Sequence, residues 1–325
     1  MSKTVFILGA GASIPYGYPS GPKLVSLILD SLDPNYLFKF SYKNKFPGSG
    51  NIMESEITQT FSDHGLYVKH GFSTNLIAEF SEALKNSNKD SIDSFLLERK
   101  SYYEIGKFAI ANCILKCENP TEFQATNQNW LKYLWNKINQ SRNDFISRDI
   151  SFITFNYDRL LEYYFYTSLK YSFDMSDKEI MDALNSKQII HLHGVVGLLP
   201  WQDQENGFDY NYTGSDINSV YNRVSKASKN IKIVYDRVEE ADQNFDRTYD
   251  LLKDANRIYI LGLGFHNLNL SRLKIQNLDK RIICSAFGLT KHECDLIESQ
   301  YPMQLQLDKI GYDSLEFLRN YLTLK

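Results

Sequence analysis

The chain has 325 residues, of which 43% are hydrophobic and 23% charged, an ordinary composition for a folded protein that excludes extensive disorder. Its formal net charge of -3 provides no global basic field, so we expect no membrane partner and only an indirect connection to nucleic acid. No apolar stretch approaches the roughly 20 residues of a membrane-spanning helix, and we expect a cytoplasmic protein.

The first half of the chain predicts one strand, one glycine turn and a largely helical segment. Residues 4–8 form a continuous apolar run, which predicts a buried parallel strand that ends at the turn 9–13. A helix is expected over residues 21–32, because Pro22 stands near its first position and apolar residues follow at helical spacing. Residues 33–52 are rich in Lys, Asn, Gly and Ser and predict a loop. Residues 53–145 predict mostly helices.

The second half predicts further strands that alternate with helices. The expected strands are residues 150–154, 188–192, 257–261 and 281–285. The expected helices include residues 217–255, in large part, and 313–324, and residues 202–216 predict a polar, mobile loop. This alternation predicts an α/β fold with a doubly wound, mostly parallel, Rossmann-like sheet. Ligands of such sheets bind beyond the carboxyl ends of the strands, so four strand ends are of interest.

The turn after the first strand reads Gly9-Ala10-Gly11-Ala12-Ser13. Glycines at this place let backbone N–H groups approach a pyrophosphate. Ile14 stands where the usual dinucleotide fingerprint has a third glycine, which disfavours an ordinary NAD-dependent dehydrogenase. A tight turn without a ligand is the alternative interpretation.

The segment TFNYD, residues 154–158, follows the second buried strand. Asn156 and Asp158 are two residues apart, and an amide with a carboxylate suits hydrogen bonding to a sugar hydroxyl, a water or a carboxamide. Helix capping by either residue is the alternative interpretation.

The segment HLHG places His191 and His193 at the end of a further strand, on one face. A histidine titrates near neutral pH and is a candidate general base, although a single histidine is more often structural. We expect His191 to matter less than His193, because it lies one step further back along the strand. The segment GLGF, residues 262–265, is another glycine turn, which is most often only a turn.

Together, GAGAS, TFNYD, HLHG and GLGF resemble, in order and spacing, the motifs of the sirtuin (silent information regulator) family. The resemblance covers a core of residues 1–32 and 150–310 within a single domain of residues 1–325, with a helical insertion at about 53–145. It implies that NAD is bound, as the substrate, by a set of residues in these motifs: Gly9, Ala10, Gly11, Ser13, Thr154, Gly262 and Gly264.

The resemblance also implies three catalytic roles. Asn156 would position water or the nicotinamide ribose, Asp158 would contact the nicotinamide carboxamide, and His193 would be the catalytic histidine. The pyrophosphate and the adjacent ribose would lie on the GAGAS turn, and the adenosine half of NAD would lie against the GLGF turn.

Two departures separate the chain from the protein-deacylating members of the family. The segment after the glycines reads IPYGYPSG, without the Asp-Phe-Arg run of those enzymes, and residues 195–256 contain no cysteine for a zinc module. The four cysteines (Cys113, Cys117, Cys284 and Cys294) lack the spacing of a zinc site, and we expect no metal. What remains resembles the sirtuin-like NAD hydrolases of bacterial anti-phage defence.

The expected activity is therefore that of an NAD glycohydrolase, which releases nicotinamide and ADP-ribose. The alternatives are an NAD-dependent protein deacylase and a non-enzymatic nucleotide-binding sensor or assembly subunit; a nuclease is weaker, because no paired-carboxylate metal motif is present. Unrestrained hydrolysis of NAD would harm the host cell. We therefore expect control by homo-oligomerisation, or by a separate sensor or activator protein.

Overall fold

The computed structural model describes residues 3–47, 52–121, 125–139, 141–211, 216–233 and 243–324. The chain forms two compact units. One, here called the sheet unit, comprises residues 1–20, 119–210 and 234–325, and the other, the helix–hairpin unit, comprises residues 21–118 and 211–233. Within the described ranges, no helix has the length and apolar character needed to cross a membrane.

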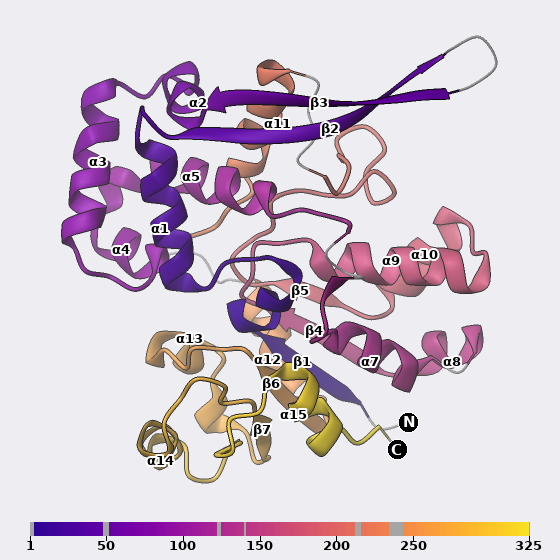
Figure 1. Cartoon of the computed structure of the whole chain (residues 1–325). Helices are drawn as coiled ribbons and strands as arrows, with labels where there is room; N and C mark the ends of the chain where they lie inside the picture. The colour runs from indigo at the N-terminus through magenta and orange to yellow at the C-terminus, as the bar shows by residue number, and fades with distance from the viewer. Residues whose placement is uncertain are drawn as a thin grey trace. The chain divides into compact units, whose positions relative to one another are not determined.

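The sheet unit is built on six parallel strands (Figure 1). In sequence order they are β1 (Thr4–Leu8), β4 (Ile150–Thr154), β5 (Ile189–His191), β6 (Arg257–Leu261), β7 (Ile282–Cys284) and β8 (Leu305–Leu307). Their spatial order is β5-β4-β1-β6-β7-β8, which is the Rossmann-like doubly wound order, and the predicted fold class is confirmed. The order of connection reverses between β1 and β6, so the crevice of such a fold lies at their carboxyl ends.

The central strands are buried along their whole length, as their apolar runs predicted. Every residue of β1 and of β4 is buried, and Thr4 of β1 is in register with Ile150 of β4 and Arg257 of β6. On one face, the Phe6 ring stacks between Phe152 and Tyr259, with ring centroids 5.4 and 5.5 Å apart. Stacked aromatic rings across three neighbouring strands fix the middle of the sheet.

Helices flank this sheet. On the β4 side they are α7 (Trp130–Ile138), α8 (Arg142–Ser147), α9 (Leu160–Phe173) and α10 (Asp177–Asn185). The helices of the C-terminal half are α12 (Gln243–Asp254), α13 (Asn267–Arg272), α14 (Lys291–Gln300) and α15 (Ser314–Tyr321). Three short 3-10 helices, η1 (Ala10–Ala12), η2 (Ile14–Tyr16) and η5 (Ile275–Asn277), lie in the connections.

The helix–hairpin unit holds six α-helices and an antiparallel strand pair in the described residues. Its helices are α1 (Gly21–Leu32), α2 (Asp63–His70), α3 (Thr74–Asn86), α4 (Ile92–Glu98), α5 (Tyr103–Lys116) and α11 (Ile217–Ser228), with the 3-10 turn η3 (Lys100–Tyr102). Its strands, β2 (Leu37–Pro47) and β3 (Ile52–Ser62), pair with Leu37 opposite Ser62. Within this unit α1 packs on α3 and α5, and α11 packs on α5.

This hairpin corrects two of the predictions. Residues 37–47 of the loop predicted over 33–52, and residues 53–62 of the helical segment predicted over 53–145, lie in strands β2 and β3 instead. In LFKFSYKNKFP aromatic and polar residues alternate over much of the segment, which is the period of a strand, and the many Lys and Asn residues obscured it. In the division into two units, helix α1 belongs to the helix–hairpin unit and residues 119–149 belong to the sheet unit.

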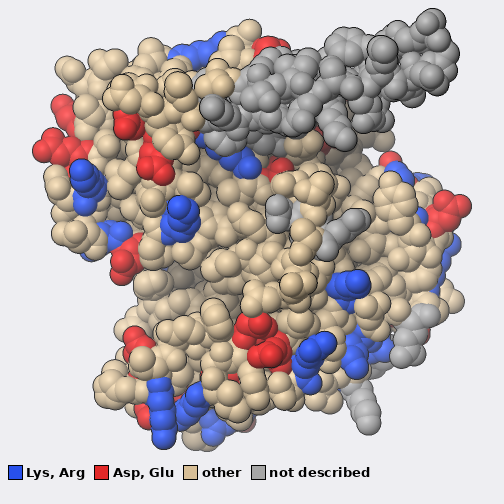
Figure 2. All heavy atoms as spheres, in the orientation of Figure 1, with Lys and Arg blue, Asp and Glu red and all other residues tan. Residues whose placement is uncertain are grey.

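Charged side chains of both signs are interspersed over the described part of the face drawn in Figure 2. The net charge of the whole sequence is -3.

Two glycine turns meet in backbone contact at the switch between β1 and β6. The Gly9 N–H donates to the Leu261 carbonyl at 2.9 Å, and the Gly11 N–H donates to the Gly262 carbonyl at 2.9 Å. A Cβ atom at Gly262 would lie 2.1 Å from the Ala12 nitrogen, and the φ angle of Gly262 is +61°. Glycine is thus required here by the contact between the turns themselves.

We predict that Gly262→Ala lowers the free energy of unfolding by roughly 4 kcal/mol or abolishes folding, since the turns would be forced apart and the backbone strained. Urea unfolding of the variant and the wild type measures this difference. Gly65→Ala in α2 is the control, because a Cβ there would meet no atom within 4 Å. It should retain wild-type stability or gain up to about 1 kcal/mol from helix propensity. Equal stability of both variants would contradict the contact.

Candidate functional site

Asn156 links the end of β4 to the glycine turn after β1. Its Nδ2 donates to the Gly9 carbonyl at 3.0 Å and to the Ser13 hydroxyl at 2.9 Å, and its own main-chain N–H donates to Thr154 Oγ1 at 3.0 Å. Both amide hydrogens are therefore used within the protein. In the described part of the chain the side-chain oxygen Oδ1 accepts no hydrogen bond, so it is the atom of Asn156 that can accept one from a ligand.

Asp158 belongs to the same hydrogen-bond network as Asn156. Ser13 Oγ donates to Asp158 Oδ2 at 2.9 Å, and the Leu160 N–H donates to Asp158 Oδ1 at 3.1 Å, at the start of α9. Burial raises the pKa of Asp158 from 3.8 to about 6, against the lowering effect of these two hydrogen bonds. Asp158 thus bonds both the glycine turn and the first residue of α9, whereas the N-cap position of that helix is Arg159, which makes no side-chain cap bond.

His193 lies just beyond the strand on which it was expected. Strand β5 ends at His191, and a turn carries His193, so the two histidines do not continue one strand face. The turn is fixed to the TFNYD segment, because the Leu192 N–H donates to the Thr154 carbonyl at 2.8 Å and the Val196 N–H to the Tyr157 carbonyl at 2.9 Å. The buried His193 ring packs against the rings of Phe155 and Tyr157, with ring centroids 5.3 and 6.0 Å apart. These two aromatic residues are the neighbours of Asn156 in the sequence.

The GLGF turn is held by a serine that was not among the predicted site residues. The Gly262 N–H donates to Ser285 Oγ at 3.0 Å, and the Ser285 N–H donates to the Ile260 carbonyl at 2.9 Å. Ser285 could have been found from the sequence, because it stands at the end of the strand predicted over residues 281–285. Gly264 differs from Gly262, because a Cβ there would meet only the His266 ring, at 3.5 Å. The protein itself therefore leaves room beside Gly264.

A tryptophan from α7 holds the glycine turn from another direction, which the motifs did not predict. The Trp130 Nε1–H donates to the Ala12 carbonyl at 2.7 Å. The hydroxyl of Tyr16 donates to Asn129 Oδ1 at 3.0 Å and accepts from the Leu131 N–H at 2.9 Å. Helix α7 thus holds the glycine turn through the Ala12 carbonyl. The Ala10 N–H makes no hydrogen bond within the described residues and can donate to an anion.

Arg159, next to Asp158, anchors the chain that follows the HLHG turn. Its guanidinium donates to the carbonyls of Leu198, Phe208 and Asp209 at 3.0, 2.8 and 3.0 Å, and lies over the Phe208 ring. The mobile loop predicted over 202–216 is thus bound to the start of α9 as far as residue 209, and residues 212–215 lie outside the described ranges.

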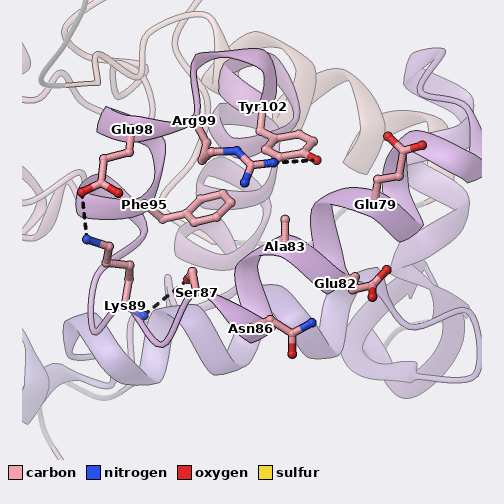
Figure 3. Close-up of a pocket in the computed structure, with 10 residues that line it drawn as sticks. All are labelled: Glu79, Glu82, Ala83, Asn86, Ser87, Lys89, Phe95, Glu98, Arg99 and Tyr102. Carbon is pink, nitrogen blue, oxygen red and sulfur yellow. Dashed lines mark hydrogen bonds and ion pairs between the residues drawn. The ribbon is translucent and has the colours of Figure 1, made fainter.

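Two pockets lined by described residues lie apart from the predicted site residues. One of about 540 Å³ in the helix–hairpin unit has Phe95 and Tyr102 near its centre and the Lys89–Glu98 ion pair, at 2.9 Å, on one side (Figure 3). Two acidic side chains, Glu79 and Glu82, form its opposite side. Another, of about 570 Å³ in the sheet unit, is walled by aromatic residues of α9 and of the anchored segment, among them Tyr163, Tyr166, Trp201 and Tyr210.

The residues that the motifs singled out therefore fall into two groups. Ser13, Asn156 and Asp158 are directly hydrogen-bonded, and the glycines are in backbone contact with one another. The His193 ring contacts the rings of Phe155 and Tyr157, which flank Asn156 in the sequence. The atoms able to bind a nucleotide are the Ala10 N–H, Asn156 Oδ1 and the His193 ring, with space at Gly264; such a set fits a phosphate and a sugar hydroxyl.

The described residues contain no group of three or more His, Cys, Asp or Glu side chains arranged to hold a metal ion. Cys113 lies on α5, Cys117 directly follows that helix, Cys284 lies on β7 and Cys294 on α14. Burial raises the pKa of the Cys113 thiol to about 12 and that of Cys284 still further, so these thiols are protonated at neutral pH.

We predict that Asp158→Asn stabilises the protein relative to the wild type at alkaline pH. A buried carboxyl whose pKa is raised stabilises the fold below its unfolded pKa of 3.8, and this contribution is lost as the pH rises through about 6. The amide does not titrate, so the gain should be only about 1 kcal/mol near pH 4.5 and approach about 3 kcal/mol at most near pH 8. Urea unfolding at the two pH values measures it. The exposed Asp250→Asn of α12 is the control; an identical response of both variants to pH would show that burial does not perturb Asp158.

The chain has been compared with known proteins: no protein-family model matches it, and no curated protein does. What is established is an α/β fold with a six-stranded, all-parallel sheet in Rossmann-like order. The likeness to sirtuins remains a resemblance in four motifs, and the activity must be inferred from the chemistry of the residues at the carboxyl ends of β1, β4, β5 and β6.

Proposed function

We propose that the chain is an NAD glycohydrolase, which releases nicotinamide and ADP-ribose and acts in bacterial anti-phage defence by depleting NAD. The observation that carries the proposal is the buried Asn156–Ser13–Asp158 network, which joins the phosphate-type glycine turn to the end of β4. Titratable and amide groups gathered at the switch point of a doubly wound sheet are typical of a nucleotide-processing site.

The reaction is the attack of water on C1′ of the nicotinamide ribose. The C1′–N bond breaks, its electron pair leaves with neutral nicotinamide, and the water loses a proton as ADP-ribose forms. The transition state resembles an oxocarbenium ion, so nicotinamide, which is already cationic in NAD, needs no strong acid to leave. The protein's task is to hold the ribose, orient the water and accept the proton.

In this proposal Asn156, His193 and Asp158 each have a different role in the reaction. The Asn156 side chain orients water or a ribose hydroxyl through Oδ1, because both of its amide hydrogens are bound to Gly9 and Ser13. His193 polarises the water or a ribose hydroxyl and accepts the proton. Asp158, bound to Ser13 and Leu160, uses its remaining lone pairs for the nicotinamide carboxamide.

The glycine turns bind the rest of NAD. The pyrophosphate and its neighbouring ribose lie on the Gly9–Ser13 turn, where the Ala10 N–H is available to donate, and Thr154 supports the Asn156 backbone. The adenosine half lies against Gly262 and Gly264. Gly262 contributes by letting the two turns meet, whereas Gly264 contributes the room that a ligand needs.

A non-enzymatic nucleotide sensor is the second candidate, and one observation favours it. The bonds of Asn156 and Asp158 position the glycine turn and start α9, which a protein that only binds nucleotide also requires. A protein deacylase would need an acylated peptide to release nicotinamide. As an effector, the protein would have its NAD hydrolysis controlled by self-assembly or by a separate sensor or activator protein.

We predict that Asn156→Ala and His193→Ala each lower the rate of nicotinamide release by roughly a thousandfold or more, since positioning and proton transfer are worth several kcal/mol. The assay incubates the folded, activated full chain with NAD and measures nicotinamide and ADP-ribose by chromatography. Asn136→Ala on α7 and His292→Ala on α14 are exposed controls and should keep the wild-type rate.

The three candidate functions give different results in this assay. Release by the wild type without any peptide supports the hydrolase, and release only with an acylated peptide supports the deacylase. NAD binding without turnover supports the sensor. Undiminished hydrolysis by both site variants would refute the assigned residues.

A further inference from the structure

His191 and Glu162 form a buried pair next to the main chain of Asn156. His191 Nε2 lies 2.8 Å from Glu162 Oε1 on α9, and His191 Nδ1 lies 3.1 Å from the main-chain carbonyl oxygen of Asn156. The two side chains are only 11% and 9% exposed. Neither residue of this pair has a role in the proposed catalytic set.

The partners of the two ring nitrogens determine where the protons lie. A carbonyl oxygen only accepts, so Nδ1 must carry a hydrogen. The second proton lies in the hydrogen bond between His191 Nε2 and Glu162 Oε1. It is bonded to the imidazole, because the imidazole is the more basic of the two groups. Glu162 Oε2 is buried and finds no hydrogen-bond partner in the described chain, so the carboxylate depends on the imidazolium for its stabilisation.

The charges around His191 favour its protonated form. Burial by itself lowers the pKa of His191, but Glu162, the Asn156 carbonyl and the nearby Asp158 carboxyl outweigh it and raise the pKa above 6.5. From α12 the contact is neutral, since Asn244 Nδ2 donates to the His191 carbonyl at 3.5 Å. Arg247 of α12 donates to Gln188 Oε1 at 3.0 Å, on the residue that precedes β5.

We propose that the His191–Glu162 ion pair is a positioning device, which holds the Asn156 backbone so that its side chain meets Gly9 and Ser13. The imidazolium donates a charge-assisted hydrogen bond to the Asn156 carbonyl, and such bonds are shorter and stronger than neutral ones. Glu162 fixes the ring orientation from α9. The catalytic part of this proposal rests on the proposed hydrolase function, whereas the protonation of the pair does not.

This role changes the expectation for His191. The sequence placed it one step behind the site and predicted a small effect, but the structure bonds it to the residue whose amide holds the glycine turn. His191 is therefore a positioning residue, and the effect of losing it should appear in kcat through Asn156. The pair also sets an alkaline limit: as the pH rises through the pKa of His191, the charge that anchors Asn156 is lost.

The first test is independent of activity. The full chain is labelled with 15N-histidine, and the ring nitrogens of His191 are assigned by their loss in His191→Gln and followed with pH by NMR. We expect both nitrogens to be protonated at pH 7 and to titrate above 6.5 in the wild type. In Glu162→Gln, which keeps the shape and removes the charge, we expect a neutral ring at pH 7 with its hydrogen on Nδ1. A neutral His191 at pH 7 in the wild type would overturn the proposal, even if the variant failed to fold.

The second test is kinetic. Glu162→Gln should lower kcat for NAD roughly tenfold, with KM changed less than about twofold, because positioning acts on the transition state. The alkaline limb of its kcat profile should move to lower pH. Glu82→Gln, an exposed carboxylate of α3, is the matched control and should match the wild type.

The two tests separate the two proposals. If the wild type releases no nicotinamide but His191 is protonated as described, the hydrolase function fails and the ion pair stands. If the wild type hydrolyses NAD while Glu162→Gln keeps its kcat and its pH profile, the positioning role is wrong and the function stands.

Discussion

The backbone contact between the two glycine turns is the constraint on which the candidate site depends. Gly9 and Gly11 donate to the carbonyls of Leu261 and Gly262, so the chain leaving β1 stays bonded to the chain leaving β6 beyond the sheet. A side chain at Gly262 would meet the Ala12 nitrogen at 2.1 Å and separate the turns. Only with the turns in contact does the Gly9 carbonyl lie within reach of Asn156.

The polar network follows from this placement, because buried polar groups must find partners. Ser13 accepts from Asn156 and donates to Asp158, so one hydroxyl joins the glycine turn to two residues of the next strand end. Stabilising the fold and binding a ligand are therefore not competing roles for these residues. The bonds that use both amide hydrogens of Asn156 leave its Oδ1 without a hydrogen bond in the described chain.

Ionisable groups are concentrated at this edge of the sheet, and burial is what gives them their properties. Asp158 is less acidic than a solvated carboxyl, with a pKa of about 6, because of its burial. His191 is more basic than a solvated imidazole, because the carboxylate of Glu162 outweighs its burial. In both groups the shift of the pKa follows from burial and from the charges nearby rather than from the residue type. The buried cysteines, by contrast, are shifted away from reactivity.

The sequence by itself determined the strands and turns of the core. The apolar and β-branched run 4–8 and the largely apolar segments 150–154 and 257–261 predicted strands of a mostly parallel sheet, because strands covered on both faces show little polar alternation. It did not determine the hairpin, whose alternation was obscured by polar composition, nor the grouping of α1 with residues 211–233. Only the tertiary structure decided which atoms meet. Ser13 and Asp158 are 145 residues apart, and Ala12 and Trp130 are 118 apart, so their bonds depend on strand order, which local patterns do not encode.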